Sequence, residues 1–128
     1  MSFANFSLLS LNVRGLSNNF KRRAIFTWCR RKSADIILLQ ETHSTSKIQN
    51  RWRNEWGAEI LFSHGKSNAR GVAILIKNNL DAKVTECHSD TSGRILMVKI
   101  QIQDVEYVIV NMYAPNKDNI GIQYYSKL

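Results

Sequence analysis

Apolar residues fall into short runs rich in β-branched side chains, which is the pattern of β-strands. The runs occur in the order Leu8–Val13, Ile36–Leu39, Glu59–His64, Val72–Ile76, Lys83–His88, Ile95–Ile102 and Val105–Tyr113. Ile36–Leu39 and Val72–Ile76 show no alternation, as expected of strands covered on both faces. Met97–Gln103 alternates, so one face of that strand should be wetter. The pattern predicts a mixed sheet in a layered fold.

Two segments have the spacing of amphipathic helices. In the first, Asn19–Lys32, we expect the apolar face to consist of Phe20, Ala24, Ile25, Trp28 and Cys29. The second is Ser46–Trp56, and Gly57 follows where a helix would stop. Because the first helix lies between two strands, it predicts a right-handed parallel unit. Asn119–Leu128 begins a further segment with helical spacing.

The chain has 128 residues, 44% of them hydrophobic, and shows neither a repeat nor a low-complexity linker. It therefore predicts one packed unit over residues 1–128, with no internal boundary. The final helical pattern stops abruptly, which indicates a portion of a larger domain.

Charge points to polyanions as partners. Eighteen Lys and Arg residues against ten Asp and Glu residues give a formal net charge of +8. On charge alone, nucleic acid binding and a merely basic surface remain equal alternatives. Cys29 and Cys87 lack the spacing of a zinc site or a disulfide framework. Signal peptide and membrane-span patterns are absent, so we expect a nuclear or cytoplasmic protein that is not secreted.

Candidate chemistry begins with Glu41, which follows the apolar run Ile36–Leu39 almost directly. Ligand sites in open sheets lie at the carboxyl ends of strands, and Mg²⁺ is often held by one or two carboxylates together with water and phosphate. Glu41 is therefore a candidate metal ligand. The alternative is a solvated loop acid, which is the commoner situation for a single Glu after a strand.

Polar residues also end the first and last strands. Asn12 and Arg14 precede a turn at Gly15, and Tyr113 and Asn116 flank Ala-Pro. An amide can orient a ligand, and a tyrosine hydroxyl can donate to a phosphate. Each of these residues has an ordinary alternative role, either in a turn or as a half-buried aromatic.

These strand ends carry a resemblance in four ordered blocks, Leu11–Leu16, Leu38–His43, Arg70–Ile76 and Asn111–Asn116. The set resembles the endonuclease/exonuclease/phosphatase family, and within it the endonuclease domain of LINE-type non-LTR retrotransposons. The resemblance implies an α/β layered sandwich of two sheets. It also implies phosphodiester hydrolysis with Mg²⁺ or Mn²⁺, and a double-stranded DNA substrate that is nicked to prime reverse transcription. It implies no membrane and no small-molecule cofactor.

Residue by residue, the resemblance implies catalytic roles for Asn12, Glu41 and Tyr113, with Glu41 and Asn12 at the metal ion. It implies DNA or phosphate contacts for Arg14, His43 and Asn116. The Thr-His after Glu41 and the Ala-Pro-Asn ending favour the retrotransposon branch over cellular apurinic nucleases.

The departure from the family pattern lies after Asn116, where the later Asp-x-Asn and Asp-His motifs are absent. We therefore expect the N-terminal portion of one domain, inactive by itself and lacking its C-terminal half. Two alternatives stay open: a cellular apurinic or exonuclease III-like repair nuclease, and a catalytically dead binding module. If the missing half supplies most of the second sheet, Ile74, Val98 and Ile109 should be more exposed than their pattern implies.

Overall fold

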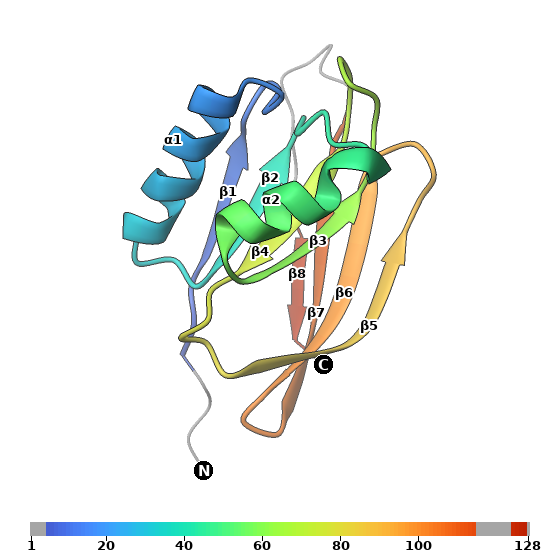
Figure 1. Cartoon of the computed structure of the whole chain (residues 1–128). Coiled ribbons are helices and arrows are strands. Elements are labelled where there is room, and N and C mark those ends of the chain that lie inside the picture. The colour runs from blue at the N-terminus through green and yellow to red at the C-terminus, as the bar shows by residue number, and fades with distance from the viewer. Residues whose placement is uncertain (1–4, 115–123, 128) are drawn as a thin grey trace.

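A computed structural model describes residues 5–114 and the strand 124–127, which form two four-stranded sheets packed face to face (Figure 1). The first sheet has the order β1 (Leu8–Asn12), β2 (Ile36–Gln40), β4 (Val72–Ile76), β3 (Glu59–Ser63). The second has the order β5 (Ala82–Ser89), β6 (Ile95–Ile102), β7 (Val105–Met112), β8 (Tyr124–Lys127). β1 and β2 are parallel, and β4 is antiparallel to both of its neighbours. The predicted mixed, layered α/β architecture is confirmed.

The helices α1 (Asn19–Arg31) and α2 (Gln49–Trp56), the latter entered through the 3-10 turn η1 (Ser46–Ile48), both pack on the outer face of the first sheet (Figure 1). The Asn18 side chain caps α1 by accepting from the Lys21 backbone N–H. α2 ends at Gly57, whose left-handed φ of 79° matches the predicted stop. Trp52 and Trp56 of α2 are buried against this sheet.

The buried face of α1 differs from the predicted one. Phe20 is 84% exposed and Trp28 is 39% exposed, whereas Arg22, Phe26 and Cys29 are buried. Arg22 can be buried because its guanidinium forms an ion pair with Glu55 of α2. The prediction was right for Cys29 and for Ile25, which pack on the core, and wrong for Phe20 and Trp28. The partner of Arg22 is distant in sequence, so helical spacing alone could not show that Arg22 is buried.

The space between the sheets is filled by apolar side chains from both. Ile74 and Val98 are fully buried there, and Ile109 is 2% exposed. The expectation that these side chains are exposed is therefore wrong. The second sheet is built from this chain's own strands, so the inner faces cover each other.

The C-terminal segment also differs from its prediction. Tyr124–Lys127 is a strand that pairs antiparallel with β7, where the sequence pattern suggested a helix. The outer face of the second sheet carries no helix within the described residues (Figure 1). Ile95 is 42% exposed on that face, and Met97, Val108 and Val110 are half-buried. Within the described residues, no helix has the length and apolar character needed to span a membrane.

Candidate active site at the carboxyl ends of the strands

Asn12 and Glu41 meet where β1 and β2 end. The parallel register pairs Asn12 with Gln40, and the loops beyond continue this pairing. The Val13 N–H donates to the Gln40 carbonyl at 3.0 Å, and the Gly15 N–H donates to the Glu41 carbonyl at 2.6 Å. The Asn12 amide nitrogen donates to the Glu41 carboxylate, and its oxygen accepts from the Arg14 N–H at 3.0 Å. Both ends of the Asn12 amide thus help to orient Glu41.

The backbone around this pair is held in unusual conformations. Arg14, Glu41, His43 and Arg70 have φ values of 51°, 55°, 60° and 61°. They are four of the six non-glycine residues with positive φ in the described part of the chain. Such conformations cost energy and persist only where surrounding contacts enforce them. The site is therefore built on strained, fixed loops.

Hydrogen bonds and close packing enforce these conformations. The Thr42 and His43 N–H groups donate to the carbonyls of Gly71 and Arg70, at 2.9 and 2.8 Å. A Cβ on Gly71 would lie 2.4 Å from the Thr42 hydroxyl oxygen, and Gly71 has φ 94°. Only glycine satisfies both restrictions. The loop after β2 and the loop before β4 are thus locked together.

Arg14 and His43 both lie beside the pair. Arg14 is exposed, and the half-buried His43 ring packs so closely on Gly15 that a Cβ there would lie 2.6 Å from Nδ1. Their predicted contacts with DNA or phosphate stay predictions.

Tyr113 follows β7 and is half-buried, with its side chain packed against the inter-sheet core. Its N–H donates to the Arg94 carbonyl at 2.7 Å. The end of β7 is tied to the end of β2 by a hydrogen bond between the side chains of Gln40 and Asn111. Tyr113 therefore lies at the same end of the molecule as Glu41. Asn116 lies outside the described residues.

Gln40 and Asn111 are polar residues at the site that the sequence did not single out. They are 6% and 0% exposed, and their amides are bonded to each other and to strand carbonyls. Each had a detectable signal. Gln40 is the polar residue that ends an otherwise apolar strand. Asn111 falls on the inward-facing side of β7, in the same alternation as Tyr107 and Ile109.

The donor set at this site suits a hard cation only in part. Within the described residues, no cluster of three His, Cys, Asp or Glu side chains could hold a metal ion. Glu41 does offer a half-exposed carboxylate already oriented by an amide. One carboxylate with water and substrate phosphate is a usual Mg²⁺ environment. The residues fit a weak or incomplete metal site.

Two ionisable groups near this end have shifted pKa values. Burial lowers the pKa of His64, whose ring nitrogens contact the Ser44 hydroxyl at 3.0 Å and the Gln49 side-chain oxygen at 2.8 Å. Burial alone would raise the pKa of Asp90. Hydrogen bonds from the Ser63 and Ser92 hydroxyls and from two backbone N–H groups nevertheless hold that pKa well below its usual range.

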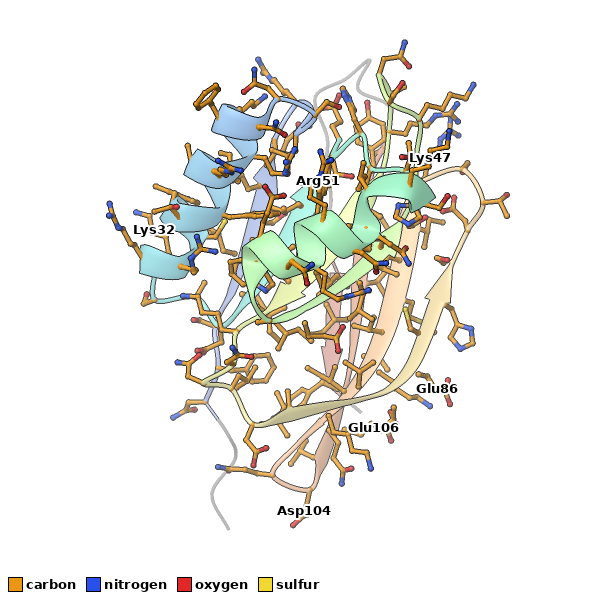
Figure 2. All side chains as sticks on the ribbon, viewed as in Figure 1. Lys32, Lys47, Arg51, Glu86, Asp104 and Glu106 are labelled. Atoms are coloured by element: carbon orange, nitrogen blue, oxygen red, sulfur yellow. The ribbon has the colours of Figure 1, made fainter. Side chains whose placement is uncertain are left out.

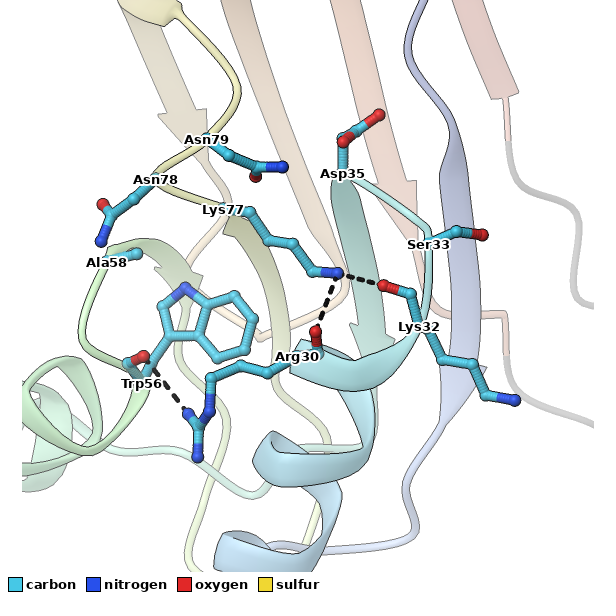
Figure 3. A pocket seen from close by; sticks show the side chains of 9 residues that line it. All are labelled: Arg30, Lys32, Ser33, Asp35, Trp56, Ala58, Lys77, Asn78 and Asn79. Atoms are coloured by element: carbon cyan, nitrogen blue, oxygen red, sulfur yellow. Dashed lines mark hydrogen bonds between the residues drawn. The ribbon is translucent and has the colours of Figure 1, made fainter.

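A separate cavity of about 430 Å³ lies at the opposite end, where α1 and α2 end (Figure 3). Lys77 donates to the carbonyls of Arg30 and Lys32, and Arg30 donates to the carbonyl of Trp56. These cations satisfy the free carbonyls at the two helix ends. The basic side chains that line this cavity therefore serve to cap the two helices.

Residues 9–125 match the model of the endonuclease/exonuclease/phosphatase family. The chain is 28% identical over 109 residues to the Transposon TX1 uncharacterized 149 kDa protein of Xenopus laevis, covering 85% of this chain and 8% of that protein.

Three solved structures share the fold. Truncated TDP2 of Caenorhabditis elegans has a TM-score of 0.67 at 16% identity, covering 88% of this chain and 48% of that one. An AP endonuclease from Archaeoglobus fulgidus has a TM-score of 0.59 at 21% identity, covering 87% and 42%. The endonuclease domain of TRAS1, a telomere-specific non-LTR retrotransposon, has a TM-score of 0.55 at 18% identity, covering 86% and 46%. The chain thus spans less than half the length of each of these relatives. By its sequence match and its two-sheet architecture, it belongs to the endonuclease/exonuclease/phosphatase family.

Proposed function

We propose that this chain is the N-terminal portion of a metal-dependent endonuclease domain of a LINE-type retrotransposon. The domain would nick double-stranded DNA and expose a 3′-hydroxyl that primes reverse transcription. The observation that carries the proposal is the contact between Asn12 and Glu41 at the carboxyl ends of two parallel strands. The sequence match to a transposon protein over most of the chain supports the retrotransposon branch.

In this proposal Glu41 is the carboxylate ligand of Mg²⁺ or Mn²⁺, and Asn12 assists at the ion and orients Glu41. The ion would neutralise charge that develops on the scissile phosphate and lower the pKa of a bound water. Tyr113 would donate its hydroxyl to a phosphate oxygen. Asn116, Arg14 and His43 would contact the DNA backbone on either side.

The distribution of charge supports a polyanionic substrate at this edge. Exposed or half-exposed cations lie on the segments that follow β1, β2, β3 and β5, namely Arg14, Lys47, Lys66, Arg70 and Arg94. Figure 2 shows Lys47 toward this end of the molecule and Glu86, Asp104 and Glu106 toward the other. Basic side chains at this edge attract DNA and favour contacts with its backbone.

The proposal that residues 1–128 form only part of a domain rests on coverage. The chain matches less than half of each related structure while its own two-sheet core is closed. Among the described residues, His43 is the only candidate general base beside Glu41. We therefore expect the chain to bind a divalent ion weakly and to lack nicking activity by itself.

Metal binding tests the central assignment. Mn²⁺ added to the chain should broaden the backbone NMR signals of Gly15 and Thr42, which flank Glu41. In Glu41→Gln this broadening should disappear, whereas Glu106→Gln, an exposed acid at the opposite end, should retain it. Asn12→Ala should lower the affinity for the ion by about tenfold or more, as loss of a supporting group usually does. Equal broadening in wild type and Glu41→Gln would exclude Glu41 as a ligand.

Nicking tests the activity. A longer protein that includes the downstream sequence should convert supercoiled plasmid to open circle with Mg²⁺, and Glu41→Ala should abolish this conversion. The 128-residue chain should leave the plasmid intact. Cleavage confined to plasmid that carries abasic sites would instead identify a repair nuclease. DNA binding by the longer protein without any nicking would identify a binding module.

A further inference from the structure

Two amide side chains link the two sheets directly beneath the candidate site. Gln40 ends β2, and its side-chain nitrogen donates to the Asn111 side-chain oxygen on β7 at 2.9 Å. The same nitrogen donates to the Ser10 hydroxyl on β1 at 3.1 Å. Asn111 in turn donates to the carbonyls of Leu39 on β2 and Ala73 on β4, at 3.0 and 2.8 Å. We call the pair Gln40 and Asn111 the amide latch.

The latch joins the strands that carry the proposed site residues. Ser10 lies two residues before Asn12, Gln40 lies directly before Glu41, and Asn111 lies two residues before Tyr113. A displacement of one sheet relative to the other would therefore change the separation between Glu41 and Tyr113. The latch resists that displacement at the end of the sheets where the separation matters.

Packing alone would not fix this displacement. The other buried contacts between the sheets are predominantly aliphatic, with Leu38, Ile74, Val98 and Ile109 near the centre. Aliphatic contacts are non-directional and tolerate small shifts, whereas buried hydrogen bonds are directional and costly to leave unmade. Burying two amides adds little net stability compared with an apolar pair of the same shape. Their main physical effect here is on position.

We infer that Gln40 and Asn111 are positioning residues that set the placement of Glu41 relative to Tyr113. This role rests on the proposed function, because it concerns two residues assigned to phosphodiester hydrolysis. Neither amide is expected to touch the substrate, since both side chains are buried.

Hydrogen exchange of the 128-residue chain separates positioning from stability. The variant Gln40→Met with Asn111→Leu removes both amides, and the one side-chain partner left behind, the Ser10 hydroxyl, is exposed to water. The site-end amides are the N–H groups of Gly15, Thr42 and Tyr113, which donate to the carbonyls of Glu41, Gly71 and Arg94 in that order. In the double variant they should exchange about tenfold faster, the factor that corresponds to one lost buried hydrogen bond.

The opposite end of the first sheet provides the internal reference. The amides of Ile36 and Lys77 are bonded to Ser7 and Asp35, far from the latch, and should exchange as in wild type. Ile109→Val, a buried apolar change on the same strand, is the matched control and should affect both ends alike. Faster exchange restricted to the site end supports the role. Equal changes at both ends, or no change, would overturn it.

If the double variant does not fold, Gln40→Met alone serves the same purpose, because Asn111 keeps its bonds to the strand carbonyls. The same comparison of the two ends decides the outcome. The exchange measurement needs neither metal nor DNA, so its failure counts only against the positioning role. Failure of the Mn²⁺ titration counts against the proposed function.

Discussion

Arg22 offers the sharpest test of how the helical layer is held. It is 2% exposed, and it pairs with both carboxylate oxygens of Glu55, at 2.8 and 3.0 Å. It also donates to the Leu16 carbonyl at 2.9 Å and lies 5.2 Å from the centre of the Trp52 ring. Arg22→Met would keep much of the packing volume and remove every one of these polar contacts.

The expected loss follows from the charge that remains. Breaking a buried ion pair costs roughly 3–5 kcal/mol when the remaining charge has no access to water. The Glu55 side chain is 17% exposed, so water partly solvates it, and we expect a loss of about 3 kcal/mol. The Arg22 hydrogen bond also lowers the pKa of Glu55, and that pKa should rise toward its ordinary value in the variant.

Urea unfolding followed by tryptophan fluorescence, to which the buried Trp52 and Trp56 contribute, measures this loss. With a slope of about 1.5–2 kcal/mol per molar urea, the midpoint should fall by roughly 1.5–2 M. Arg23→Met is the matched control, since Arg23 is 68% exposed and lies 3.5 Å from the same carboxylate. It should cost no more than about 0.5 kcal/mol.

A double variant, Arg22→Met with Glu55→Leu, should regain most of the stability, because no unpaired charge remains. Equal midpoints for the Arg22 and Arg23 variants would refute the burial argument. Losses that simply add in the double variant would show that the pair is not the source of the effect.

Three further predictions concern other parts of the fold. Burial lowers the pKa of His64 below its unfolded value, so its contribution to stability is complete above about pH 6.5 and is lost as the pH falls. The urea midpoint should therefore drop more between about pH 7.5 and about pH 5.5 in wild type than in His64→Gln. Gly71→Ala should lower the free energy of unfolding by at least about 2 kcal/mol, because the new Cβ would meet Thr42. Gly57→Ala, where a Cβ meets open space, should lower it by about 1 kcal/mol, and thermal unfolding measures both. Lys77→Met should lower stability by about 1–2 kcal/mol, because two carbonyls at the end of α1 lose their donor (Figure 3). An unchanged unfolding curve would show that water replaces the lysine as donor.

The local pattern was sufficient to predict the strands of the first sheet. Ile36–Leu39 and Val72–Ile76 lack alternation, and both lie in strands that are buried along their whole length. The contact of Asn12 with Glu41 followed from two parallel strands ending at one edge. Such features depend on residues near one another in sequence or on one general topological rule.

What the sequence did not predict depends on long-range partners. The burial of Arg22 needs Glu55, and the Gln40 amide needs Asn111, 71 residues away. The origin of the second sheet was also misjudged. A strand's partner is not encoded in its own alternation, so Ile109 could not be assigned to a closed core without knowledge of β2 and β4.

The closure of the inter-sheet core within the first 112 residues has a consequence for synthesis. The buried side chains of that core all lie at or before Ile109, and among the described residues only the half-buried Tyr113 packs on it from beyond β7. Domains generally acquire structure from the N-terminus as the chain is made. A ribosome-bound nascent chain that has just released β7 should thus already resist proteolysis. If the chain continues as proposed, the outer face of the second sheet, which no described helix covers and which exposes Ile95, would be a preformed surface on which later segments assemble.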